Sequence, residues 1–221
     1  MYSFRKEPDQ RASPRLRAMQ QTIQCEHIPG APEFRALSGI LGLHVDLRYA
    51  TPDNFVGRDL YSPLDCAWLH RDAAAALEHS IAWLAAERPD HHLLLLDALR
   101  PQRVQEELWA SLQGTDLLGY LANPVRGSIH SFGMAVDVTL IDAAGRELDM
   151  GTRFDDMTLR SHPAQEAALL ARGELTPAQI ENRKLLRGAM QHGGWRGINS
   201  EWWHFDCGDR ERVRAEYRRV L

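Results

Sequence analysis

The clearest pattern of hydrophobic and polar positions is a run of three predicted elements in the first half of the chain. In RDAAAALEHSIAWLAAERPD, Leu77, Ile81 and Leu84 recur at the spacing of one helix face, and Pro89 ends the run. The next stretch, HHLLLLDAL, carries four consecutive leucines and is typical of a strand buried on both faces. PQRVQEELWASL then predicts a second helix with Pro101 at its first helical position.

The second half of the chain repeats this mixture of strand and helix signals. GMAVDVTLID alternates, which predicts a strand with Val136 and Val138 on one face and Asp137 on the other. RELDM follows a turn at DAAG and predicts a return strand. In TPAQIENRKLLRGAMQHGG, Thr176 and Gln179 form a capping box and two glycines end the predicted helix.

Shorter signals complete the predicted architecture. A strand is expected from Leu43 to Tyr49, another at EWWHFDC, and a charged helix at the C-terminus, whereas residues 1–36 are polar and predicted to be irregular. Because helices and strands do not alternate regularly, we predict an α+β fold with a mostly antiparallel central sheet flanked by helices. At 221 residues, with no repeat or low-complexity linker, the chain is expected to form a single domain, 1–221.

Composition narrows the classes of partner and location. A formal charge of −4 provides no basic surface for nucleic acid, and the longest apolar run, LLLL at 93–96, is far shorter than the ~20 residues of a membrane span. The first twenty residues contain no apolar core of a secretory signal. Three widely spaced cysteines indicate no disulfide framework, so a cytoplasmic protein is expected. The oligomeric state is not indicated.

One candidate site lies in SIHSFGMAVD, where His130 precedes the predicted strand and Asp137 lies within it. Gly133 permits a turn that would let the two side chains face one point. A carboxylate in an apolar strand needs a metal, a cation or hydrogen bonds, because burying it unpaired costs several kcal/mol. Backbone amides or an arginine would serve equally well, so this pair alone does not establish a metal.

A second candidate site is EWWHFD, with Glu201 and His204. In an ideal strand residues three apart point to opposite faces, so the two converge only if Glu201 lies in the turn entering the strand. The two tryptophans would shield a site and lower its dielectric constant. An aromatic core strand with an exposed glutamate is the competing interpretation.

Together the two segments supply three ligands of the nitrogen and oxygen type, His130, Asp137 and His204. Three such ligands with an open coordination position are typical of a catalytic zinc site. Glu201 would then lie where a general base for the attacking water is needed. Five of the other histidines (His70, His79, His91, His92 and His162) fit surface or packing positions better.

SIHSFGMAVD and EWWHF resemble the S-x-H-x-x-G-x-A-x-D and E-x-W-H motifs of the zinc D-alanyl-D-alanine dipeptidases, within the group that also holds the D-Ala-D-Ala carboxypeptidases. The resemblance covers roughly residues 40 to 206 in the family's order. It extends to four further stretches: YATPDNFVGRDLY, DALRPQ, LDMGTRFDDM and NRKLLRGAMQHGGW.

The resemblance implies a role for each matching residue. One Zn²⁺ would be held by His130, Asp137 and His204, with Glu201 as catalytic base. Arg100, in LRPQ, matches the family arginine that stabilises the developing oxyanion. Two further positions, Ser128 and Asp155, match those that bind the free amino end of a small dipeptide, and Asp156 is the neighbouring acid that could be mistaken for Asp155.

Two alternative functions stay open at this point. A carboxypeptidase or endopeptidase acting on peptidoglycan stems would use the same metal, although its substrate lies outside the cytoplasm. A hedgehog-like binding module would keep the zinc scaffold without catalysis, which would require Glu201 or Arg100 to be missing or misplaced.

Overall fold

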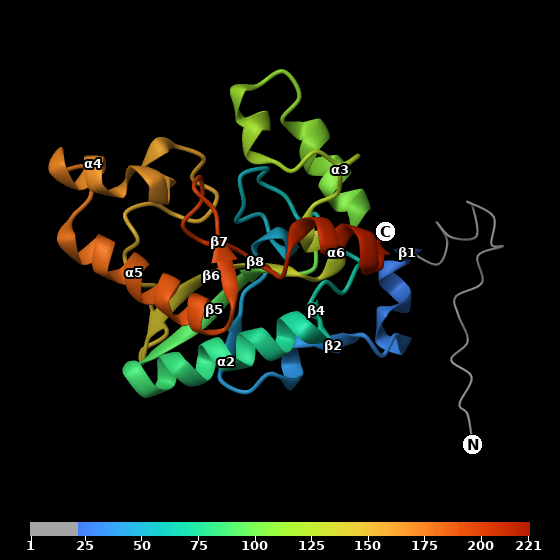
Figure 1. Ribbon diagram of the computed structural model, residues 1–221. Helices are drawn as coiled ribbons and strands as arrows, with labels where there is room; N and C mark the ends of the chain where they lie inside the picture. The colour runs from blue at the N-terminus through green and yellow to red at the C-terminus, as the bar shows by residue number, and fades with distance from the viewer. Residues whose placement is uncertain (1–21) are drawn as a thin grey trace.

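The computed structural model describes residues 22–221, which form a mixed arrangement of helices and strands around a five-stranded sheet (Figure 1). The strand order is β3-β5-β6-β8-β7. β3 and β5 are parallel, whereas the other three pairings are antiparallel. The α+β expectation is confirmed, and that of a mostly antiparallel sheet holds in part because β3 is parallel. The strands are β3 Leu43–Val45, β5 His91–Asp97, β6 Ala135–Asp142, β7 Trp195–Gly197 and β8 His204–Cys207.

Two long helices, α2 (Arg71–Glu87) and α5 (Pro177–His192), pack against each other and against the sheet (Figure 1). Their apolar faces form the main core together with the Val136 and Val138 face of β6. Asp137 projects from the opposite face of the same strand, so the sheet separates the core from the site. The remaining α-helices are α3 Gln102–Ser111, α4 Glu166–Ala171 and α6 Arg210–Glu216.

Short elements surround this core. Two small sheets pair β1 (Thr22–Ile23) with β9 (Arg219–Val220) and β2 (Phe34–Ala36) with β4 (Trp68–His70). The expectation that residues 1–36 are irregular is therefore wrong from Thr22 onward, and its part before Thr22 lies outside the described residues. The 3-10 helices are η1 Cys25–Gly30, η2 Leu37–Gly39, η3 Arg48–Ala50, η4 Asp116–Tyr120, η5 Ile129–Phe132, η6 Leu159–Ser161 and η7 Pro163–Gln165.

The strongest sequence signals are confirmed. α2, β5, β6 and α5 form where the pattern predicts them, and α3 follows Pro101. The capping box of α5 has both of its hydrogen bonds, from Gln179 N to the Thr176 hydroxyl and from Thr176 N to the Gln179 side chain. Pro101 is the N-cap residue of α3, with an extended ψ of 150°, and not its first helical residue.

Three predicted strands are shorter than expected. The strand from Leu43 ends at Val45, because Arg48–Ala50 coils into η3. RELDM contributes only one bridge, Ile141↔Glu147. The Asp142 side chain stabilises the tight turn before it, and after this bridge the chain diverges from β6. EWWHFDC becomes a strand only at His204. Among residues 22–221, no helix combines the length and apolar character needed to cross a bilayer.

Candidate active site

A tight turn brings His130 next to β6. His130 lies in η5, which is followed by Gly133 as its C-cap, with a φ of 64° in the left-handed region. A Cβ at this position would lie 2.7 Å from the backbone nitrogen of His70, so only glycine fits both the conformation and the space. The same nitrogen donates a hydrogen bond to the carbonyl oxygen of Gly133, which fixes the turn against β4.

Strand register brings the other two candidate ligands together. Asp137 on β6 and His204 on β8 are direct antiparallel partners. Side chains of directly opposed residues lie on the same face of a sheet, so the pairing itself points both toward His130. Glu201 lies in the loop that enters β8, as convergence requires.

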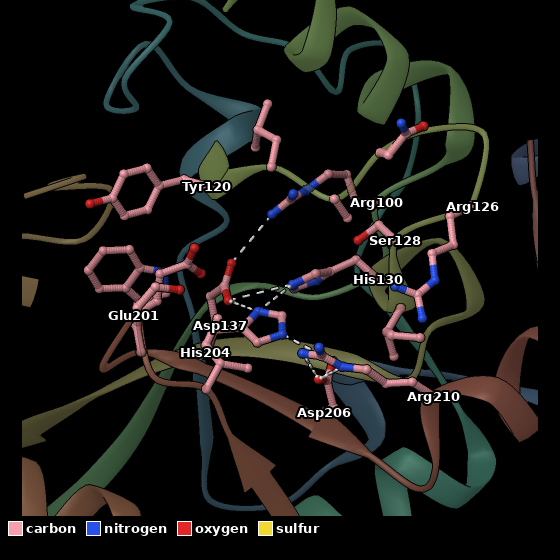
Figure 2. A pocket seen from close by; sticks show the side chains of 18 of the residues that line it. Arg100, Tyr120, Arg126, Ser128, His130, Asp137, Glu201, His204, Asp206 and Arg210 are labelled. Carbon is pink, nitrogen blue, oxygen red and sulfur yellow. Dashed lines mark hydrogen bonds and ion pairs between the residues drawn. The ribbon is translucent and has the colours of Figure 1, made fainter. Parts of the chain in front are cut away.

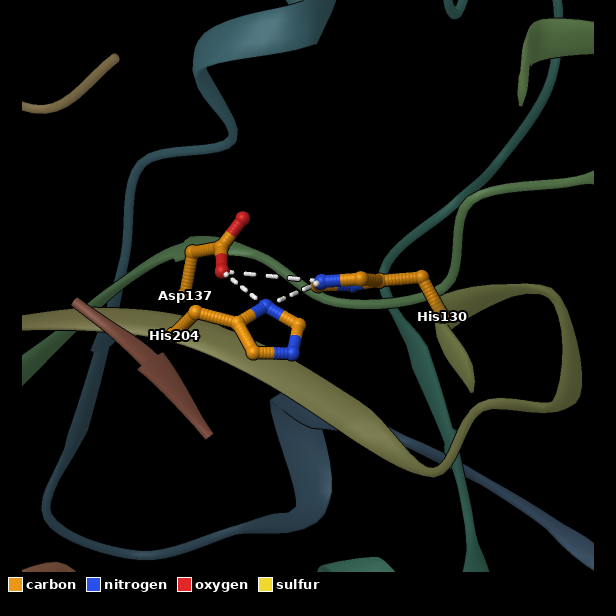
Figure 3. A group of neighbouring side chains, drawn as sticks. All are labelled: His130, Asp137 and His204. Carbon is orange, nitrogen blue, oxygen red and sulfur yellow. Dashed lines mark hydrogen bonds and ion pairs between the residues drawn. The ribbon is translucent and has the colours of Figure 1, made fainter. Parts of the chain in front are cut away.

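Three atoms converge at one point, as Figure 3 shows. His204 Nδ1 lies 3.0 Å from Asp137 Oδ1 and 3.2 Å from His130 Nε2, and the third side of this triangle is 3.5 Å. Tetrahedral coordination with bonds of about 2.0–2.1 Å places ligand atoms about 3.3 Å apart. The triangle therefore has the dimensions of one face of a metal tetrahedron. It is the only such group of three found among residues 22–221.

The second nitrogen of each imidazole is held by an acceptor. His130 Nδ1–H donates to the carbonyl oxygen of Ala98 at 2.7 Å, and His204 Nε2–H donates to Asp206 Oδ1 at 3.0 Å. Burial alone would raise the pKa of Asp206, but His204 and Arg210 lower it to about 2, so this acceptor is ionised. Such bonds fix the ring orientation and the tautomer, which leaves the inward-facing nitrogens free to bind a metal.

A buried acid–arginine network supports the site from β5. A β-bulge between Leu95 and Asp97 turns Asp97 to the face of its register partner Asp137. Asp97, fully buried, accepts hydrogen bonds from the Tyr61 hydroxyl and from Arg100, whose Nη2 lies 2.6 Å away. The same Nη2 lies 3.4 Å from Asp137 Oδ2, so Arg100 bridges the two carboxylates.

Arg100 and the three candidate ligands line a cavity of about 370 Å³ (Figure 2). The volume lies within the range of small-molecule sites. Glu201 projects into this cavity near Asp137, and burial raises the pKa of its carboxyl group to about 7, with the charge of Asp137 acting in the same direction. A carboxylate with a pKa near neutrality can both accept and release a proton at physiological pH.

Asp155 lines the same cavity, and one of its two carboxylate oxygens has no hydrogen-bond partner. Its backbone is strained, with a φ of 60°. Tyr49 donates a hydrogen bond of 3.1 Å to Asp155 Oδ1, whereas Oδ2 is buried without a partner. Burial and the charge of Asp137 raise the pKa of Asp155 well above its ordinary value. A cation placed at this oxygen would restore the ionised form.

The structure brings all seven sequence-predicted site residues to this one cavity: Arg100, Ser128, His130, Asp137, Asp155, Glu201 and His204. Trp203 also lines it, while Trp202 packs behind at 5.3 Å between ring centroids. Sequence reasoning missed two supporting acids, Asp97 and Asp206. Both lie in quoted apolar strands, where the energetic argument made for Asp137 applies equally.

Comparison with known proteins agrees with this geometry. The profile of one family, described as D-ala-D-ala dipeptidase, matches residues 32–220. A D-alanyl-D-alanine dipeptidase of Escherichia coli (strain K12) is 40% identical over 164 residues, covering 74% of this chain and 78% of the relative. A protein of the same name from Enterococcus faecium is 32% identical over 186 residues, covering 74% of this chain and 85% of the relative.

The resemblance noted in the sequence motifs is thus confirmed over nearly all of the described residues. The family match covers both segments that carry the candidate ligands, residues 128–137 and 201–205. This chain therefore belongs to the D-ala-D-ala dipeptidase family and is an enzyme of the metallopeptidase class.

Proposed function

We propose that this enzyme hydrolyses D-alanyl-D-alanine, or a close D,D-dipeptide, to free amino acids with the help of one Zn²⁺ ion. The observation that carries the proposal is the triangle of His130, Asp137 and His204 atoms in the same cavity as the raised-pKa carboxyl of Glu201. The names of the relatives supply the substrate.

The donor set fits zinc. Two imidazole nitrogens and one carboxylate oxygen are common zinc ligands, and three protein ligands leave a fourth position for chemistry. Asp137 is poised to bind, because His130 and His204 hold its pKa below the ordinary value despite burial. When bound, Zn²⁺ supplies Lewis acidity, which polarises a carbonyl group and makes water more acidic.

Glu201 and Arg100 would carry the proton and charge transfers. The carboxylate of Glu201 takes a proton from the attacking water and passes it to the leaving amine as the peptide bond breaks. The guanidinium of Arg100, held rigid by Asp97 and by Gln105, lies ready to stabilise the negative charge that develops on the carbonyl oxygen.

Asp155 and Ser128 would bind the free amino end of the dipeptide. The unpartnered Oδ2 of Asp155 is the group that an ammonium ion would satisfy, and Tyr49 orients that carboxylate. Ser128 is buried at the start of η5 and lines the same cavity. Recognition of an ammonium at this point would favour free dipeptides over blocked or longer peptides.

The whole chain is proposed to act as one catalytic domain, and its cytoplasmic location stays a prediction. Of the two alternatives, the non-catalytic binding module is disfavoured because Glu201 and Arg100 both reach the cavity. A carboxypeptidase with the same metal differs in its need for a blocked amino end.

The test is metal analysis of the purified chain combined with turnover of D-Ala-D-Ala and N-acetyl-D-Ala-D-Ala. We expect one zinc per chain, turnover of the free dipeptide, and loss of about 10²- to 10⁴-fold in rate with zinc retained in Glu201→Gln. Preference for the acetylated substrate would support the carboxypeptidase, and bound metal without hydrolysis of any D-amino-acid dipeptide would support the binding module.

A further inference from the structure

Three arginines form a basic rim on one side of the cavity. Arg126 comes from the loop before η5, and Arg210 and Arg214 come from α6. Figure 2 shows Arg126 and Arg210 beyond His130, on the opposite side of the ligand group from Tyr120 and Glu201. None of the three has a part in the mechanism proposed above.

The three arginines of this rim are paired with only two carboxylates. Arg210 Nε donates to Asp206 Oδ2 at 2.6 Å. Arg126 and Arg214 both donate to one oxygen, Oε1 of Glu211, at 2.6 Å and 3.0 Å. Three guanidinium groups therefore meet two carboxylates, and two of the three share a single acceptor atom.

Like-charge crowding is visible at Arg214, the least exposed of the three. Its side chain is 14% exposed, against 67% for Arg126 and 49% for Arg210. Burial lowers the pKa of Arg214, and repulsion from Arg126 and Arg210 lowers it further, against the opposing attraction of Glu211 and Asp206. An anion entering this side of the cavity would relieve that repulsion.

We infer that Arg126 and Arg214 bind the C-terminal carboxylate of the dipeptide and select substrates that end at the second residue. The inference rests on the proposed function, because it places the leaving amino acid on the α6 side of the metal ligands. Glu211 then acts as an internal competitor: its side chain occupies the guanidinium groups in the free enzyme and yields them to the substrate. Hydrogen bonds from arginine side chains to a carboxylate are charge-assisted and directional.

The experiment is calorimetric titration of the zinc-loaded Glu201→Gln chain, in which turnover is slowed, with D-Ala-D-Ala and with D-alanyl-D-alaninamide. Arg126→Ala is expected to raise the Kd of the free acid about 3- to 10-fold, a modest change because this side chain is exposed, and to leave the amide unaffected. Glu211→Gln is expected to lower the Kd of the free acid, since it removes the competitor.

Arg212→Ala is the matched control. It lies on the same helix, is 69% exposed and pairs with Glu216, but does not line the cavity. If Arg126 had a purely structural role, Arg126→Ala would change the Kd of both ligands alike. In that case Glu211→Gln would not lower the Kd of the free acid. The inference is overturned if Arg126→Ala weakens binding of the acid and of the amide equally, or weakens neither. It is also overturned if Glu211→Gln leaves binding of the acid unchanged.

Failure of the proposed function gives a different result. If the unsubstituted chain hydrolyses no dipeptide but still prefers the free acid through Arg126, the carboxylate site stands and the dipeptidase assignment fails. If it hydrolyses D-Ala-D-Ala but Arg126→Ala does not distinguish acid from amide, the assignment stands and the carboxylate site is wrong.

Discussion

His204 Nε2 lies 3.0 Å from Asp206 Oδ1, so a carboxylate two residues along the same strand orients an imidazole that faces the candidate metal position. Asp206 is itself held by Arg210. The contact therefore links the candidate metal site to α6, and it makes Asp206 a positioning residue for His204.

Asp206→Asn is expected to weaken zinc binding about 10- to 100-fold, because an amide orients the ring less firmly and lowers its basicity. Competition with a chromogenic chelator measures the change. Glu216→Gln, an exposed acid on α6 that pairs with Arg212, serves as the control and should bind zinc like the unsubstituted chain. Equal affinities for all three proteins would remove Asp206 from the site.

Glu201 is expected to destabilise the metal-free protein at neutral and alkaline pH. Its folded-state pKa of about 7 exceeds the ordinary value of 4.5, so the folded state holds the proton more tightly than the unfolded state. Stability is therefore lost as pH rises from about 4.5 to 7, and the penalty is complete above that window. Below that pH window, ionisation of Glu201 does not change the free energy of unfolding.

Glu201→Gln should accordingly stabilise the metal-free chain above pH 7 by about 3 kcal/mol and have no such effect near pH 4. Urea unfolding in the presence of a chelator at both pH values measures this. Glu181→Gln, whose side chain is exposed and paired only with Lys184, is the control. A gain in stability that is equal at both pH values would contradict the assigned pKa.

Asp155→Asn is expected to raise KM for D-Ala-D-Ala about 10-fold or more, because the ammonium group loses its charged partner. The rate with N-acetyl-D-Ala-D-Ala, which has no ammonium, should not fall. Asp156→Asn provides a matched control, since this adjacent acid does not line the cavity. If the two variants behave alike, Asp155 does not bind the amino end.

Gly133→Ala is expected to destabilise the fold and disturb His130 together. A Cβ there meets both a φ of 64° and the His70 backbone nitrogen at 2.7 Å. Gly173→Ala is the control, because Gly173 has a φ of 70° and open space around it. Thermal unfolding should show Gly133→Ala to be less stable than Gly173→Ala by about 1–3 kcal/mol, the cost of overpacking alone.

The sequence predicted the long elements well because their signals are local. The helix spacing of α2 and the capping box of α5 involve residues within one or two turns of each other. The two-residue strands β1 and β9 carry no periodic signal, and they form because residues 22–23 meet residues 219–220, which are distant in sequence. The length of the strand at RELDM likewise depends on pairing with a neighbouring strand, which the alternation of polar and apolar residues does not show.

The site was predictable in its residues and less so in its support. His130, Asp137, His204 and Glu201 stand in recognisable motifs. Asp97 reaches Asp137 only through a bulge in β5, and bulges depend on the pairing of strands. The arginines of the basic rim are dispersed along a chain in which arginine is common, so only their shared cavity distinguishes them.

Because Asp137 and His204 pair across β6 and β8, the candidate metal ligands and the walls of the cavity can change independently in evolution. The candidate metal position depends on the backbone register of β6 and β8, and a slip of one residue would separate Asp137 from His204. Away from the strands, the walls of the cavity come from loops, from the 3-10 helices η3, η4 and η5, and from the short helix α6. Divergence or engineering could therefore rewrite which dipeptides are accepted while the hydrolytic centre stays as it is.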